Sequence, residues 1–164
     1  LSLHDALPIF EPSNIYLEPE GRNTAPAACI AALLGIEHCA DGVVLLMPSD
    51  HHIAPLNKFH STIEAAAASA VAGAVVTLGI EPGEPSTAYG YIRRSKETSA
   101  GGDTRIFSVA HFAEKPDYNT ARAMLKEGGY LWNSGIFLFA GMAMIAEFER
   151  FVVFFLKYVF RRYS

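Results

Sequence analysis

The middle of the chain alternates between apolar runs and helical patterns. An unbroken apolar run at residues 43–47 stops abruptly at Pro48, and polar residues follow it. Such a run predicts a strand buried on both faces, as in a parallel sheet that helices cover. Apolar residues then recur at helical spacing over 55–71, and a second strand-like run occupies 75–80. We therefore predict a unit of strand, helix and strand in which the two strands are parallel.

The same patterns predict the remaining elements. Further strands are expected at 15–17, 88–94, 106–112 and 130–139, and further helices at 24–34, 117–126 and 143–151. Gly35, Gly73 and Gly128 are expected to end helices, because glycine adopts the left-handed conformation found there without a steric penalty. The polar segment 95–103 is predicted to be an exposed hairpin connection. Together these elements indicate one α/β domain.

Composition narrows the class of protein. The 164 residues are 51% hydrophobic and 18% charged, which is ordinary for a globular domain with a real core. A formal net charge of -4 without a basic cluster argues against a nucleic-acid partner. Two cysteines, Cys29 and Cys39, give neither a disulfide framework nor a zinc knuckle, so we expect a reducing, cytoplasmic setting. The apolar tail at 151–160 is too short to span a membrane, and no membrane partner is predicted.

Asp50 follows the predicted strand at 43–47. Ligands bind at the carboxyl ends of strands in open α/β sheets, and Mg²⁺ prefers carboxylate oxygens. Asp50 is therefore a candidate Mg²⁺ ligand. The alternative is that Asp50 caps the helix that follows, and this segment alone favours neither interpretation.

Arg22, Asn23 and Thr24 lie in a turn-rich loop before an alanine-rich helix. Directional donors at a helix N-terminus suit a nucleobase edge or a phosphate. A capped helix start explains Asn23 and Thr24 equally well.

Polar residues also interrupt or end the later strands. Gly90, between two tyrosines, lets the backbone approach a ligand, although a glycine in a strand can equally mark a bulge. Glu114 and Lys115 at a strand end have the chemistry to hold a sugar hydroxyl and a phosphate, or form a solvated charge pair. Asn133 offers a donor and an acceptor to sugar hydroxyls, and core packing does not explain the polar Asn-Ser-Gly sequence around it.

Five motifs occur together in one order. They are E-P-E-G-R-N-T-A-P at 18–26, P-S-D-H at 48–51, Y-G-Y-I at 89–92, E-K-P at 114–116 and W-N-S-G at 132–135. In this order and spacing the chain resembles the mannose-1-phosphate guanylyltransferases, enzymes that make GDP-mannose. The resemblance covers residues 11–151.

The resemblance implies a fold, a reaction and a set of site residues. The fold is a three-layer, Rossmann-like nucleotidyltransferase fold, incomplete at the N-terminus. The reaction is attack by the phosphate of mannose 1-phosphate on the α-phosphorus of GTP, with release of pyrophosphate. The implied contacts are Arg22, Asn23 and Thr24 for the guanine side, Asp50 for Mg²⁺, Gly90, Glu114 and Asn133 for mannose, and Lys115 for the sugar phosphate. Asp50 and Lys115 are thus the implied catalytic residues.

The chain also departs from that family. The glycine-rich loop that cradles the triphosphate does not precede Glu11, and residues 1–10 and 152–164 do not resemble the family. We therefore expect an internal fragment in which 11–151 form a partial nucleotidyltransferase domain, and we expect this fragment to be inactive on its own. The alternatives are a transferase for another sugar 1-phosphate, or a non-catalytic module that binds nucleotide sugars.

Overall fold

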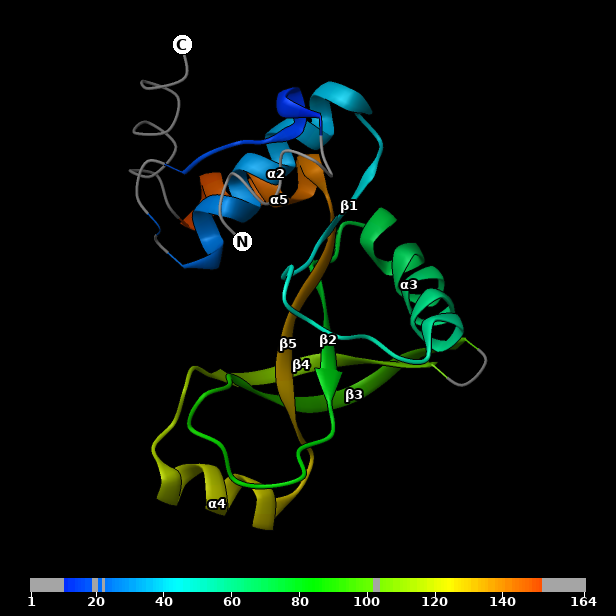
Figure 1. The fold of residues 1–164 in the computed structure, drawn as a ribbon. Helices are drawn as coiled ribbons and strands as arrows, with labels where there is room; N and C mark the ends of the chain where they lie inside the picture. Colours follow the sequence, from blue (N-terminus) through cyan, green and yellow to red (C-terminus); the bar gives the residue numbers. More distant parts are fainter. Residues whose placement is uncertain (1–10, 19–20, 22, 102–103, 152–164) are drawn as a thin grey trace.

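The computed structural model describes residues 11–18, 21, 23–101 and 104–151. Its elements are the 3-10 helix η1 (Pro12–Asn14), α2 (Thr24–His38), β1 (Val43–Leu46), α3 (Leu56–Val71), β2 (Val76–Ile80), β3 (Tyr91–Gly101), β4 (Thr104–Ala113), α4 (Tyr118–Glu127), β5 (Tyr130–Ala140) and α5 (Gly141–Phe151) (Figure 1). The fold is a mixed α/β domain. The segments 1–10 and 152–164 lie outside the described residues, so their expected departure from the family stays a prediction.

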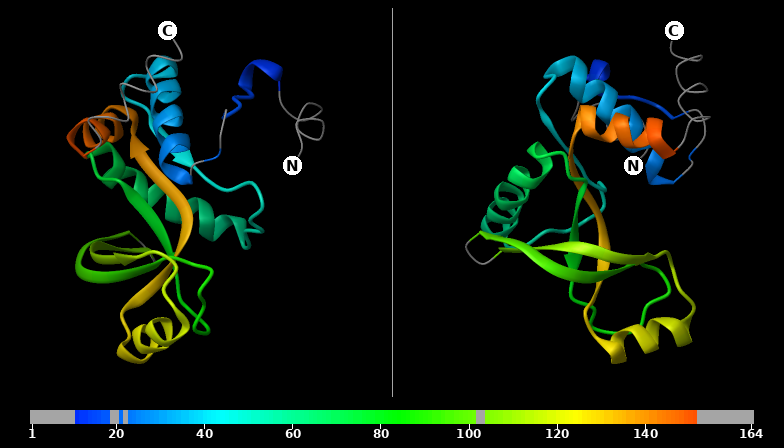
Figure 2. Two further views of the ribbon diagram at one scale, coloured as in Figure 1. Left: turned by 90° about the vertical axis from the view of Figure 1, so that its left-hand side faces the viewer. Right: turned by 180° about the vertical axis from the view of Figure 1, so that it is seen from behind.

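β5 is the central strand of the sheet, because β1, β2 and β3 all pair with it. The described strands form a five-stranded sheet in the order β1-β5-β3-β4, and β2 also pairs with β5. β1 and β2 both pair with Leu138 of β5, through Leu45 and Val76, so they lie on opposite edges of that strand. The β3 to β4 hairpin joins through the first residues of β5 and lies across it (Figures 1 and 2).

The predicted parallel sheet is wrong for the described strands, because all their pairings are antiparallel. β1 and β2 do run in the same direction, since both are antiparallel to β5, but β5 separates them. The expected burial of β1 on both faces is also wrong: Leu45 is 38% exposed, and Met47, which follows the strand, is 40% exposed. A short apolar run specifies a strand between helices, and it does not specify the direction of its neighbour.

Helices pack on both faces of the sheet around β1, β2 and β5. On one face, α2 and α5 lie side by side and bury Phe139 of β5 together with Val44 of β1 (Figure 2). On the other face, Ala66 and Ala70 of α3 pack against Leu138. Alternate residues of β5 thus face opposite helical layers, as the period of two along a strand requires.

α2 shows why one predicted helix end is wrong. The helix continues through Gly35 and ends only at His38. A Cβ built on Gly35 would lie 2.5 Å from Cγ2 of Val44, so this glycine allows α2 to pack closely against β1. Gly35 is therefore a glycine because α2 and β1 pack closely at this position. The sequence prediction took it for a helix end.

Two extended segments also differ from expectation. Residues 15–17 were predicted to form a strand, but they follow η1 without regular secondary structure, and Tyr16 and Leu17 are exposed. β3 continues to Gly101 through most of the predicted hairpin connection, with several register shifts against β4. The guanidinium of Arg105 pairs with the carboxylate of Glu97 across these strands at 2.6 Å, one of the cross-strand pairs of this exposed ribbon.

The other helix signals are confirmed. α3 ends at Val71, and Gly73 follows it with a φ of 92°. Asp117 caps α4 by accepting a 2.8 Å hydrogen bond from the backbone N–H of Thr120, and Gly128 with a φ of 77° ends that helix. No helix within the described ranges is long and apolar enough to cross a membrane.

Candidate functional site

The polar Asn-Ser-Gly sequence is a bulge in β5. Thr77 of β2 pairs with Phe137 and Gly79 pairs with Asn133, so two steps along β2 correspond to four along β5. Gly135 lies within this bulge in the left-handed region, with a φ of 74°. Bulges of this kind interrupt strand pairing and reorient side chains, often beside functional sites.

Side chains satisfy the backbone groups that the bulge leaves unpaired. Oδ1 of Asn133 accepts hydrogen bonds from Oγ1 of Thr77 at 2.8 Å and from the backbone N–H of Gly135 at 3.3 Å. Oγ of Ser134, which is buried, accepts from the N–H of Ile136 at 3.1 Å. The oxygen of the Asn133 carboxamide is thereby engaged, and its nitrogen is left for other partners.

The loop after β1 lies against the bulge. Cγ of Pro48 is 3.4 Å from the position that a Cβ on Gly135 would occupy. Asp50 and Asn133 consequently line one cleft of about 640 Å³. Its other lining residues include His51, His52, Tyr89 and Trp132, with Lys58, Phe59 and Thr62 from α3.

Asp50 does not cap a helix. α3 begins at Leu56 with Pro55 in the N-cap position, and the carboxylate of Asp50 makes no hydrogen bond or ion pair within the described part of the chain. The alternative that the sequence left open is thus excluded, and the carboxylate remains exposed in the cleft. No group of three or more His, Cys, Asp or Glu among the described residues could hold a metal ion, so Asp50 would act as a single protein carboxylate.

Gly90 adjoins both Asn133 and Glu114. The N–H of Asn133 donates a 2.8 Å hydrogen bond to the carbonyl oxygen of Gly90. A Cβ on the buried Gly90 would lie 2.9 Å from Oε2 of Glu114 and 2.9 Å from Cζ of Phe112. Gly90 therefore allows the carboxylate to approach the backbone closely, and it precedes β3, so it is no bulge within that strand. The structure brings these three candidate sugar contacts together.

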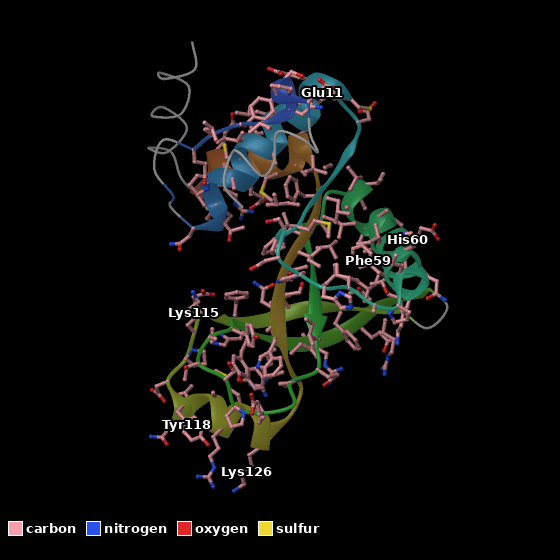
Figure 3. All side chains as sticks on the ribbon, viewed as in Figure 1. Glu11, Phe59, His60, Lys115, Tyr118 and Lys126 are labelled. Carbon is pink, nitrogen blue, oxygen red and sulfur yellow. The ribbon has the colours of Figure 1, made fainter. Side chains whose placement is uncertain are left out.

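Lys115 lies at the start of the connection from β4 to α4 (Figure 3). Phe59, which lines the cleft, lies on α3. The ammonium nitrogen of Lys115 is 3.9 Å from Oε1 of Glu114, and the two side chains are 62% and 63% exposed. Lys115 has a φ of 43°, a conformation that costs a non-glycine residue energy and is enriched at functional sites. Lys115 and Glu114 do not line the 640 Å³ cleft, but Glu114 borders Gly90 beside it.

The structure describes only two of the three candidate guanine contacts, Asn23 and Thr24. Arg22 lies outside the described residues. Asn23 occupies the N-cap position of α2 with a φ of 59°, yet its side chain makes no capping hydrogen bond. Capping therefore does not explain Asn23. Neither Asn23 nor Thr24 lines the cleft that holds Asp50 and Asn133.

Sequence reasoning missed part of the cleft wall. The rings of Tyr89 and Trp132 lie 4.9 Å apart at 46°, and Nε1 of Trp132 is buried without a hydrogen-bond partner among the described residues. Lys58 of the cleft wall was predicted only as part of a helix. Thr77, which contacts Asn133 from outside the cleft, was predicted only as part of a strand. Motif spacing identified Tyr89 and Trp132 as neighbours of site residues, but the bulge that brings Thr77 to Asn133 has no recognisable signal in the β2 sequence.

Comparisons with known proteins agree with this fold. A family model described as "Nucleotidyl transferase" matches residues 9–162. The chain is 45% identical over 141 residues to the xanthan biosynthesis protein XanB of Xanthomonas campestris pv. campestris (strain B100), covering 86% of this chain. It is 44% identical over 140 residues to the mannose-1-phosphate guanylyltransferase of Escherichia coli (strain K12), covering 84% of this chain. In both cases the match spans only 29% of the relative's length.

Two solved structures are also similar. One is described as a mannose-1-phosphate geranyltransferase from Thermus thermophilus, with a TM-score of 0.77, 32% identity, and coverage of 88% of this chain and 41% of that one. The other is described as a mannose-6-phosphate isomerase from Helicobacter pylori, with a TM-score of 0.74, 30% identity, and coverage of 86% and 50%. The chain therefore belongs to the nucleotidyl transferase family and is homologous to mannose-1-phosphate guanylyltransferases.

Proposed function

We propose that this chain contributes to guanylyl transfer from GTP to mannose 1-phosphate, which gives GDP-mannose and pyrophosphate. The observation that carries the proposal is the arrangement around Gly90, which adjoins both Asn133 and Glu114. This arrangement lies beside the cleft that Asp50 lines. This set offers a carboxylate, a carboxamide and a close backbone approach, which are the groups that recognise sugar hydroxyls. A relative that is 44% identical over 140 residues is described as a mannose-1-phosphate guanylyltransferase.

In the proposed reaction, a phosphate oxygen of mannose 1-phosphate forms a bond to the α-phosphorus of GTP. The bond from that phosphorus to the oxygen bridging it to the β-phosphorus breaks, and its electrons leave with pyrophosphate. Such a transfer depends on positioning and charge neutralisation, and it needs no nucleophilic side chain. The whole protein's activity is part of this proposal, because the chain spans 29% of the length of the guanylyltransferase compared above.

Each candidate residue has one part in this reaction. Glu114 accepts hydrogen bonds from mannose hydroxyls, and the carboxamide nitrogen of Asn133 donates to a mannose oxygen. The ammonium of Lys115 binds the sugar phosphate and holds it for attack. Asn23 and Thr24, with Arg22 before them, contact the guanine side of GTP.

The environment of Asp50 fits Mg²⁺. Its carboxylate is exposed in the cleft and has no protein partner in the described part of the chain, and Mg²⁺ often binds through one carboxylate, water and substrate phosphates. When bound, Mg²⁺ would neutralise phosphate charge. Asp50 would hold it in the cleft.

The test measures pyrophosphate release and ligand binding with the 164-residue chain. We expect mannose 1-phosphate to bind more tightly than glucose 1-phosphate, and GTP more tightly than ATP. Pyrophosphate release from GTP that requires mannose 1-phosphate and Mg²⁺ would support catalysis by this chain. Tight binding of GDP-mannose without release would instead support a binding module, and a preference for glucose 1-phosphate would contradict the proposed sugar.

A further inference from the structure

Thr77 lies on β2 opposite the bulge of β5, and no role in the reaction has been given to it above. We infer that Thr77 is a positioning residue that fixes the orientation of the Asn133 carboxamide, so that its nitrogen is presented to the cleft. Thr77 itself does not line the cleft that holds Asp50, so it acts through Asn133. The choice of mannose 1-phosphate as the ligand rests on the proposed function.

The donors around Asn133 determine which way its carboxamide faces. The backbone N–H of Gly135 can only donate, so the atom 3.3 Å from it must be the oxygen Oδ1. Oγ1 of Thr77, 2.8 Å from the same oxygen, then serves as the second donor. Both lone pairs of Oδ1 are used on the side of the bulge. Nδ2 has no partner in the described part of the chain, and Asn133 lines the cleft.

The Thr77 hydroxyl is needed because the Gly135 bond alone is long. Oγ1 carries one proton, and its possible acceptors are Oδ1 of Asn133 at 2.8 Å and the carbonyl oxygen of Ile136 at 3.0 Å. A valine at position 77 has the same shape as threonine and donates to neither. Oδ1 would then keep one long hydrogen bond, and the carboxamide would be free to rotate its nitrogen away from the cleft.

This arrangement specifies the ligand atom that Asn133 recognises. A carboxamide held by its oxygen presents two N–H donors, which suit an acceptor oxygen of a sugar. The neighbouring Glu114, by contrast, presents acceptors, which suit hydroxyl donors. A hexose with hydroxyls on adjacent carbons supplies both an acceptor oxygen and a hydroxyl donor. Asn133 and Glu114 would each bind one of them.

The experiment compares Thr77→Val with Thr77→Ser in the 164-residue chain. The first measurement needs no ligand: the NMR resonances of the Asn133 side-chain N–H₂ group, with those of the exposed Asn57 as an internal control. We expect Thr77→Val to shift the Asn133 resonances and Thr77→Ser to preserve them. The second measurement is binding by titration calorimetry, in which Thr77→Val should lose about tenfold in affinity for mannose 1-phosphate and keep its affinity for GTP.

The outcomes separate this inference from the proposed function. Unchanged Asn133 resonances in Thr77→Val overturn the inference, even if the unaltered chain binds mannose 1-phosphate. Shifted resonances without any binding of mannose 1-phosphate support the positioning role and contradict the proposed ligand. If Thr77→Val does not fold, Thr77→Ala, which also removes the hydroxyl donor, is measured in the same way and decides between these outcomes.

Discussion

The backbone N–H of Asn133 donates a 2.8 Å hydrogen bond to the carbonyl oxygen of Gly90. This bond joins the bulge of β5 to Gly90, the residue that precedes β3. Glu114, which follows β4, approaches Gly90 at the same point. Asn133 and Glu114 are therefore held on the two sides of one small residue. Anything that enlarges that residue should disturb both side chains at once.

Gly90→Ala is expected to weaken binding of mannose 1-phosphate by about tenfold, with a loss of stability of about 1–3 kcal/mol. The added methyl group would lie 2.9 Å from both Oε2 of Glu114 and Cζ of Phe112, so both side chains must move. Calorimetric titration and thermal unfolding measure the two effects. The matched control is Gly83→Ala, because a Cβ there would meet nothing within 4 Å. Equal affinity in the two variants would contradict a role for Gly90 in the sugar site.

Asp50→Asn is expected to lower Mg²⁺-dependent pyrophosphate release roughly hundredfold while leaving the melting temperature unchanged. The substitution removes the charge but keeps the shape, and the carboxylate has no protein partner to lose within the described residues. If this chain alone shows no turnover, GTP affinity is measured with and without Mg²⁺ instead. Mg²⁺ should raise the GTP affinity of the unaltered chain and should raise that of Asp50→Asn much less.

Asp41→Asn serves as the control for Asp50, because Asp41 is also exposed and lies before β1, away from the cleft. A response to Mg²⁺ that survives Asp50→Asn would exclude Asp50 as the metal ligand. A melting temperature that falls with Asp50→Asn but not with Asp41→Asn would give Asp50 a structural role instead.

Lys115→Met should reduce affinity for mannose 1-phosphate by roughly ten- to hundredfold and affinity for GTP much less, since a charged hydrogen bond to the sugar phosphate is lost. The exposed Lys126 at the end of α4 provides the control variant Lys126→Met (Figure 3). Fluorescence or calorimetric titrations with each ligand give the two dissociation constants. An equal loss for both ligands would assign Lys115 to the triphosphate.

Local signals in the sequence predicted the helices and the turns between them well. The helical period gave α3, and Gly128 was expected to end α4, as it does. The strand pairing could not be predicted in the same way. The direction of β5 relative to β1 and β2 depends on where the chain returns after the β3 to β4 hairpin, and no residue of β1 encodes that path.

The site was predictable to the extent that its motifs are contiguous. Gly90, Glu114 and Asn133 were expected to act together, and in the structure Gly90 adjoins both Asn133 and Glu114. Thr77 could not be found, because its neighbours Val76 and Leu78 are ordinary core residues of a strand. Only the bulge on the opposite strand gives its hydroxyl a partner, and pairing across strands is not visible from one strand alone.

The cap of α4 leads to a prediction about pH. The pKa of Asp117 is lowered, first by the hydrogen bond that the backbone N–H of Thr120 donates to its carboxylate. A carboxylate with a lower pKa in the folded state stabilises the fold above its unfolded pKa, and this contribution is lost as the pH falls through the folded value. Asp117→Ala should therefore lower the melting temperature at pH 7, and the difference from the unaltered chain should shrink as the pH falls below about 3.9.

Asp117→Asn separates the charge from the hydrogen bond in this test. Its carboxamide oxygen can still accept from Thr120, but it does not titrate, so its melting temperature should lie between the other two at pH 7. The difference between Asp117→Asn and Asp117→Ala should remain when the pH is lowered, because neither side chain ionises. If the unaltered chain kept its full advantage over Asp117→Ala at low pH, the carboxylate would not be the stabilising form, and the cap would act through the shape of the side chain alone.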